Sequence, residues 1–197
     1  MNKMINSDNN TTEEDIMKKR LVFIIAILFL LVGCGNEFDT PTKEVEVFLN
    51  KYQTNDSEVV NQFDTSLLDE GNLNEEQKEK YKEIMLGQYK DLTYEIKEEK
   101  IDGNQATVEV EIEVYDYTTA LDNAYMYLEE NQDQFYIDDV LDVVSFVDYK
   151  LEQLFNYKNR ITYNIVFKLE RENSNSEWGL QELSETDLKK IHGIYDN

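Results

Sequence analysis

A regular alternation of apolar and polar residues near the middle of the chain restricts the fold more than any other feature. From Ala106 to Val114 every second residue is apolar, and the residues between them are threonine or glutamate. Successive side chains of a strand point to opposite faces, so the pattern predicts a strand with one buried face and one acidic, solvated face. A shorter alternation over residues 92–97 precedes it, and Asp102-Gly103-Asn104 between the two is typical of a hairpin turn. The middle of the chain is therefore predicted to be an antiparallel hairpin.

Helical patterns precede this hairpin. Thr40-Pro41 predicts a helix start, with threonine as the N-cap and proline at the first helical position, and apolar residues follow at helical spacing. A short second helix is predicted around residues 59–63. Asn74 and Gln77 resemble a capping box, which predicts a third helix that runs to about Tyr89.

Helical spacing returns between about residues 119 and 158. Thr119 and Asp122 suggest an N-cap for a first helix with Tyr125 on its apolar stripe, and a polar break follows near residues 131–134. A second, longer helix is predicted from the spacing of the apolar residues Val140, Val144, Val147, Leu151, Leu154 and Phe155.

The chain is predicted to end with a second hairpin and a short helix. Residues 161–169 alternate again, residues 178–183 form a fourth strand, and Ser184 with Asp187 caps the helix. Because no βαβ alternation is present, we predict an α+β fold with N-terminal helices packed on an antiparallel sheet. Two hairpins separated by a long helical segment make up one domain over residues 41–197.

The N-terminal region has the features of a secretory signal. Lys18-Lys19-Arg20 is followed by an apolar run over residues 21–32, which is too short to span a bilayer because a spanning helix needs about 20 apolar residues. The run ends in Leu31-Val32-Gly33-Cys34, which resembles a bacterial lipobox. This resemblance implies a diacylglyceryl lipid on Cys34 and cleavage between Gly33 and Cys34.

The predicted signal peptide therefore covers residues 1–33, and residues 34–40 form a tether. The acidic residues ahead of the basic cluster indicate that translation starts at Met17. The mature protein would lie on the extracytoplasmic face of the cell membrane. It would be anchored there through the lipid on Cys34, which is expected to contain palmitate and diacylglycerol. The alternative interpretation of Cys34 is an ordinary cysteine beside a buried helix.

Composition excludes several classes of function. The formal net charge of −23 argues against nucleic-acid binding, because phosphates are bound by clustered lysine and arginine. One cysteine and one histidine leave no disulfide framework, zinc site or catalytic triad. His192 is expected in a frayed C-terminal segment, with a surface or packing role. No nucleotide-binding motif is present, and we expect neither a cofactor nor a metal.

Acidic clusters are more simply explained as a solvated face than as metal sites. Asp138, Asp139 and Asp142 are expected on one helix turn, where their oxygens could bind Ca²⁺. They do not follow the spacing of an EF-hand loop, and neither does the acidic stretch from residue 69 to 76.

The order of these elements resembles a known group of proteins. The lipobox, the Thr-Pro helix start, the hairpin LTYEIKEEKIDGNQATVEVEIEVYDY and the ending WGLQELSETDLKKIHGIY are similar to small NTF2-like (cystatin-like) lipoproteins of Firmicutes. Most of these are domains of unknown function. The resemblance covers about residues 41–195 and implies a helix packed on a curved antiparallel sheet around a conical pocket. The long segment over 119–158 departs from the compact pattern, and it could cap the pocket, fill it or indicate a different arrangement.

Tyrosines are the most informative polar residues for such a pocket. Tyr94 and Tyr163 fall on the apolar faces of their strands, and Tyr115, Asp116 and Tyr117 end the long central strand, where the cone would open. Buried tyrosine hydroxyls can line ligand pockets, although core packing is the simpler explanation for these residues.

The sequence therefore predicts a lipid-anchored extracytoplasmic protein that binds a small ligand or another envelope protein without catalysis. Its acidity indicates either that a partner presents a basic patch or that the charge mainly provides solubility. One alternative is an NTF2-like enzyme, of isomerase or hydrolase type, that uses aspartate and tyrosine. A second alternative is an interaction protein with a filled core and no pocket, which acts through its surface.

Overall fold

The structure, a computed structural model, describes residues 40–68 and 73–195. The predicted signal peptide, the start at Met17, the lipidated Cys34 and the tether up to residue 39 lie outside the described residues. No described helix combines the length and the apolar character that crossing a membrane requires.

Four strands form one sheet, antiparallel throughout, in the order β1-β2-β5-β6. The strands are β1 (Thr93–Asp102), β2 (Gln105–Tyr115), β5 (Arg160–Glu170) and β6 (Gly179–Leu180). The predicted α+β class and the central hairpin are confirmed. The fourth strand is much shorter than the predicted 178–183.

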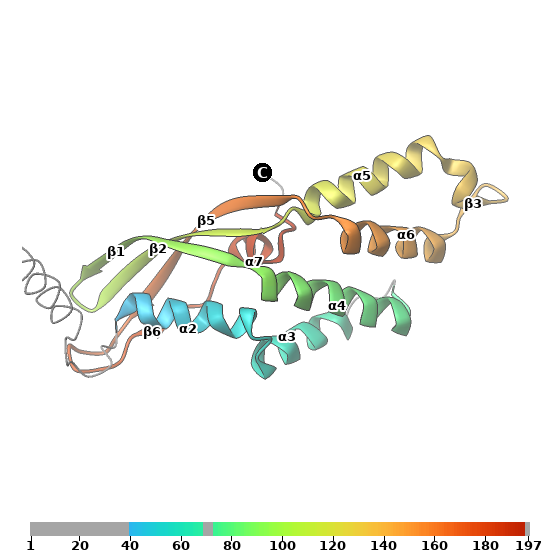
Figure 1. Cartoon of the computed structure of the whole chain (residues 1–197). Helices are drawn as coiled ribbons and strands as arrows, with labels where there is room; N and C mark the ends of the chain where they lie inside the picture. Colours follow the sequence, from blue (N-terminus) through green and yellow to red (C-terminus); the bar gives the residue numbers. More distant parts are fainter. Residues whose placement is uncertain (1–39, 69–72, 196–197) are drawn as a thin grey trace, which may run out of the picture. The chain divides into compact units, whose positions relative to one another are not determined.

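Helices cover one face of this sheet. They are α2 (Pro41–Gln53), α3 (Ser57–Leu68), α4 (Glu75–Asp91) and α7 (Glu185–His192). Helices α2, α4 and α7 pack on β2, and α3 packs on α2 and α4 (Figure 1). The predicted caps are confirmed, because Thr40 accepts a hydrogen bond from the Lys43 N–H and Asn74 forms a capping box with Gln77.

The alternation of β2 and β5 separates a buried face from a solvated one. The inward residues of both strands are buried, among them Val108, Ile112, Ile165 and Phe167. On the outer face four glutamates of β1 and β2 are paired with basic side chains. Lys97 bridges Glu95 and Glu111 at 2.8 and 2.9 Å, Lys100 contacts Glu98 at 2.6 Å, and Arg160 contacts Glu113 at 3.0 Å.

Between β2 and β5 the chain forms a helical arm, which we define as residues 116–159. The arm comprises α5 (Tyr117–Glu130), the 3₁₀ turn η1 (Gln132–Gln134), a small hairpin of β3 (Tyr136–Ile137) and β4 (Val140–Leu141), and α6 (Val143–Asn156). It continues beyond the ends of β2 and β5, and α6 packs against α4 (Figure 1). The Asp116 N–H donates to the Asn159 carbonyl at 3.0 Å, so the arm leaves and rejoins the sheet at one point.

Several predictions for the arm were wrong. Helix α5 is capped by Asp116, which accepts from the Thr119 N–H, and not by Thr119 or Asp122. Val140 belongs to β4, and α6 begins only after its N-cap Asp142. Tyr125, Val144 and Phe155 are exposed instead of facing inward.

The aspartates at the end of the arm are also placed differently from the prediction. Asp138 and Asp139 form the turn between β3 and β4, with φ of +50° and +63°, and therefore do not share a helix turn with Asp142. In residues 40–68 and 73–195 no group of three or more potential metal ligands was found.

Candidate functional site

The five predicted pocket residues lie at two places in the fold. Tyr94 and Tyr163 share one row of the sheet, on either side of Ile112, and the Tyr163 hydroxyl donates to the Tyr195 carbonyl at 3.0 Å. Tyr115, Asp116 and Tyr117 lie at the root of the arm. The rings of Tyr115 and Tyr117 stack with their centroids 6.0 Å apart, while the Asp116 carboxylate caps α5.

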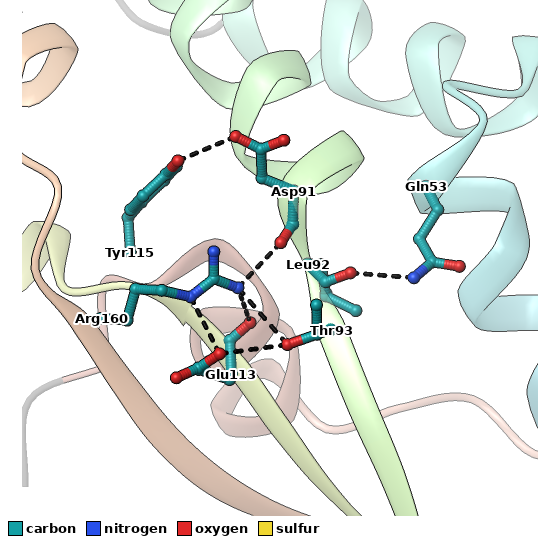
Figure 2. A network of polar contacts seen from close by, with 7 residues as sticks. All are labelled: Gln53, Asp91, Leu92, Thr93, Glu113, Tyr115 and Arg160. Carbon is teal, nitrogen blue, oxygen red and sulfur yellow. Dashed lines mark hydrogen bonds and ion pairs between the residues drawn. The ribbon is translucent and has the colours of Figure 1, made fainter.

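Arg160 connects four elements at this root (Figure 2). Its Nη2 donates to the Asp91 carbonyl at 2.8 Å and to the Glu113 carbonyl at 2.9 Å, and its Nε lies 3.0 Å from Glu113 Oε2. The guanidinium lies 5.3 Å from the centre of the Tyr115 ring, whose hydroxyl donates to Asp91 Oδ2 at 2.8 Å and whose pKa this hydrogen bond raises. These contacts of Arg160 with α4 and β2 fix where the arm begins, and we assign Arg160 and Tyr115 a structural role.

The C-terminal segment closes the same region, contrary to the predicted fraying. Gly193 follows α7 with φ of +69°, and its carbonyl accepts from the Thr118 N–H at 3.1 Å. The buried Gln88 donates to the carbonyl of His192, and the Tyr89 hydroxyl lies 2.7 Å from His192 Nδ1. His192 is therefore a packed residue.

Burial gives His192 a testable pH dependence. Loss of hydration lowers the pKa of His192 from 6.5 to about 4. Between these pH values the unfolded chain binds a proton at this residue and the folded chain does not, so stability falls as the pH falls from 6.5 towards 4 and is unaffected above 6.5. The full effect is about 3 kcal/mol.

Urea unfolding of the wild type and of His192→Asn, measured at several pH values, checks this expectation. Asparagine keeps an acceptor near the position of Nδ1 but does not titrate. On acidification the wild type should lose more stability than the variant, because only the wild type has the imidazole of His192. Protonation of the carboxylates affects both proteins equally and therefore does not contribute to the difference. Parallel curves would contradict the assignment.

A small apolar cavity of about 230 Å³ lies between α4, α5 and α6, and it includes one predicted pocket residue, Tyr117. The rest of its lining is Leu73, Tyr81, Leu121, Val147, Lys150, Leu151, Leu154 and Ile194. Its volume is below the roughly 300–1,000 Å³ of most ligand pockets. In the part of the chain that the structure describes, the buried polar side chains are Gln77 and Gln88, so no buried carboxylate lies beside a tyrosine.

The end of the arm presents a different kind of site. Four aliphatic residues at the β3–β4 hairpin and the start of α6 are exposed, and we call them the tip surface: Ile137, Val140, Val143 and Val144. Ile137 and Val140 form a cross-strand pair and expose 65% and 68% of their surface. A group of exposed apolar side chains on a protein surface is typical of an interaction site.

Aromatic packing holds the tip surface in place. Phe135 and Phe146 are buried inside the arm with ring centroids 5.5 Å apart, and Tyr127 and Tyr149 pack around Phe135. The Asp142 N–H donates to the Phe135 carbonyl at 2.7 Å, which fixes the hairpin to the start of α6.

An open groove of about 670 Å³ lies next to the tip surface, between the first turns of α4 and α6. Val144 belongs to both. The groove also carries Glu76, Asp148 and Glu152, with Lys80 as the one basic residue among its lining. Gln77 connects its two walls, because its side chain donates to Val144 O at 3.2 Å and to Asp148 Oδ1 at 2.8 Å.

Sequence reasoning missed this surface, although a signal was present. The chain has no lysine, arginine or histidine between Lys100 and Lys150. Within this stretch, Ile137 and Val140 flank an Asp-Asp pair, a pattern that suits an exposed acidic hairpin better than a buried helix.

Comparison with known proteins identifies no family. No family model and no curated protein match the chain. Among solved structures, ycdA of Bacillus subtilis, a candidate lipoprotein, is similar with 14% identity and a TM-score of 0.39. The match covers 70% of this chain and 45% of that chain, so this chain spans less than half of its length. So weak a likeness assigns neither a family nor an activity.

Proposed function

We propose that the chain is a lipid-anchored extracytoplasmic module that binds another protein through the helical arm. The observation that carries the binding part of this proposal is the tip surface, a group of exposed aliphatic side chains on a rigid support. The anchoring part rests on the lipobox-like Leu31-Val32-Gly33-Cys34. Membership of the NTF2-like lipoproteins stays a prediction.

Protein binding is supported better than the two alternatives. An enzyme of the predicted type needs a carboxylate buried beside tyrosines, and within the described residues the buried polar side chains are two glutamines. A small-molecule binder needs an enclosed pocket of sufficient volume. The groove of about 670 Å³ is open, and the apolar cavity beside Tyr117 has a volume of only about 230 Å³. Binding of a protein through the tip surface requires neither a buried carboxylate nor an enclosed pocket.

Photo-crosslinking in intact cells tests the proposal. A photoreactive phenylalanine analogue replaces Tyr136, an exposed aromatic residue of β3, and in a control strain it replaces Val166, an exposed residue of β5 on the outer face of the sheet. We expect a discrete adduct of increased mass from position 136 and none from position 166. Excess chain without the crosslinker should compete the adduct away. Equal crosslinking from both positions would refute binding through the arm.

A further inference from the structure

The carboxylates of the arm differ from most of those on the outer face of the sheet in that they lack ion pairs within the part of the chain that the structure describes. On the outer face of the sheet most of the glutamates of β1 and β2 are paired with a lysine or with Arg160, namely Glu95, Glu98, Glu111 and Glu113, whereas Glu109 is in no ion pair with a described residue. Among the described residues, none of the carboxylates of the arm lies in an ion pair. These carboxylates are Asp116, Asp122, Glu129, Glu130, Asp133, Asp138, Asp139, Asp142, Asp148 and Glu152.

The cations nearest in sequence do not change this balance. Lys150 lies over the rings of Tyr125 and Phe146, at 5.3 and 5.2 Å from their centres. Lys158 lies over Tyr115 and Phe155 at the root of the arm. The tip surface is therefore bordered by carboxylates that lie in no ion pair with another described residue. Asp138 and Asp139 form the turn, Asp142 caps α6, and Glu76, Asp148 and Glu152 outnumber the single Lys80 in the groove.

We propose, as a consequence that rests on the proposed function, that the tip surface and the adjoining groove bind a basic amphipathic segment of a partner protein. Apolar side chains of that segment cover Ile137, Val140 and Val144, and its lysine or arginine side chains reach the carboxylates around them. Charge complementarity of this kind selects a partner and speeds association.

The same charges disfavour the two other occupants of an exposed apolar surface. An anionic membrane surface repels Asp138 and Asp139, which would have to approach the lipid together with Ile137 and Val140. A second copy of the chain would bring two acidic tips together, and like charges across an interface are unfavourable.

Hydrogen–deuterium exchange on the full chain in phosphatidylcholine nanodiscs tests this inference. The probe is a peptide of about 18 leucine and lysine residues, arranged so that its helix has one apolar and one basic face. At about ten times its Kd, the peptide should slow amide exchange in residues 135–144 about tenfold. A peptide with glutamate in place of lysine, and a scrambled leucine–lysine peptide, should leave this exchange unchanged.

Two double variants separate the apolar contribution from the charge contribution. Ile137→Ser with Val140→Ser should abolish the protection, and Val47→Ser with Val166→Ser, two exposed positions off the arm, should not. Asp138→Asn with Asp139→Asn should weaken peptide binding about fivefold. Asparagine tolerates the positive φ of both positions, so the turn is preserved. The matched neutralisation of the cross-strand pair Glu98→Gln with Glu109→Gln should have no effect.

Three other outcomes of the exchange experiment would overturn the inference. Protection of residues 135–144 by the nanodisc without peptide, or protection that increases with protein concentration alone, would assign the surface to lipid or to a second copy and overturn the inference. Equal protection by the glutamate peptide would also overturn it. If photo-crosslinking from position 136 persists in these cases, the proposed function stands without a basic partner.

Discussion

Replacing Gly193 with alanine is expected to destabilise the domain by about 3 kcal/mol. Two costs add. The φ of +69° is unfavourable for a residue with a side chain, and an added Cβ would lie 2.1 Å from the Tyr115 carbonyl oxygen and 2.9 Å from Gln88 Nε2. Because the obstacle is backbone at the end of a central strand, the structure cannot relieve it by a rotamer change. The melting temperature should fall by roughly 10 °C.

Gly103 provides a matched control for this prediction. It has a similar φ of +62°, in the turn between β1 and β2, but an added Cβ would meet nothing within 4 Å. Gly103→Ala should therefore show only the conformational cost, about 1 kcal/mol. Equal losses in the two variants would mean that the close approach of Gly193 to Tyr115 does not matter for stability.

The largest functional effect is expected from Cys34→Ala. If Cys34 carries the lipid, its loss removes both the anchor and the processing site, and the chain should accumulate as an uncleaved precursor absent from the lipid-anchored pool. Metabolic labelling with a radioactive fatty acid, followed by detergent phase partitioning, measures both results.

Gly35→Ala serves as the control, since it alters the residue after the lipobox-like motif and should leave labelling and processing unchanged. A Cys34→Ala chain that is still cleaved and still enters the detergent phase would disprove lipid attachment at this residue.

Local signals allowed much of the fold to be predicted. The caps at Thr40, Asn74 and Ser184 depend on hydrogen bonds to residues three positions away, and all three are present. The alternation of β2 reflects the burial of one face of the sheet. This pattern is visible in the sequence of a single strand, without knowledge of its neighbours.

The boundaries of the arm depend on distant residues and could not be predicted in the same way. Asp116 caps α5 because pairing of β2 with β5 ends at Tyr115 and Arg160, and the sequence around Asp116 offers Thr119 and Asp122 as equally good caps. The β3–β4 hairpin has strands of two residues and a turn of two aspartates. Such short strands leave no detectable alternation in the sequence, so the helical spacing of Val140 and Val144 predicts a helix there instead.

The candidate site was harder to predict than the fold. Tyr117, a predicted pocket residue, lines a small cavity, and its role in ligand binding stays a prediction. The exposure of Ile137 and Val140 follows only from the small hairpin in which they lie. His192 and Gly193 acquire their packed positions through contacts with α4 and β2, about a hundred residues earlier in the chain.

The hydrogen bond between Asp116 and Asn159 has a consequence for how such a protein can change. Since the arm leaves and rejoins the sheet at one point, it is an insertion in a hairpin whose register is complete without it. Related chains can therefore exchange, shorten or lengthen this segment while the strand pairing is kept, because loop-closure entropy grows only slowly with loop length. Binding specificity can then diverge through changes in the outer part of the arm, while the packing of α6 on α4 and the pairing of β2 with β5 are kept.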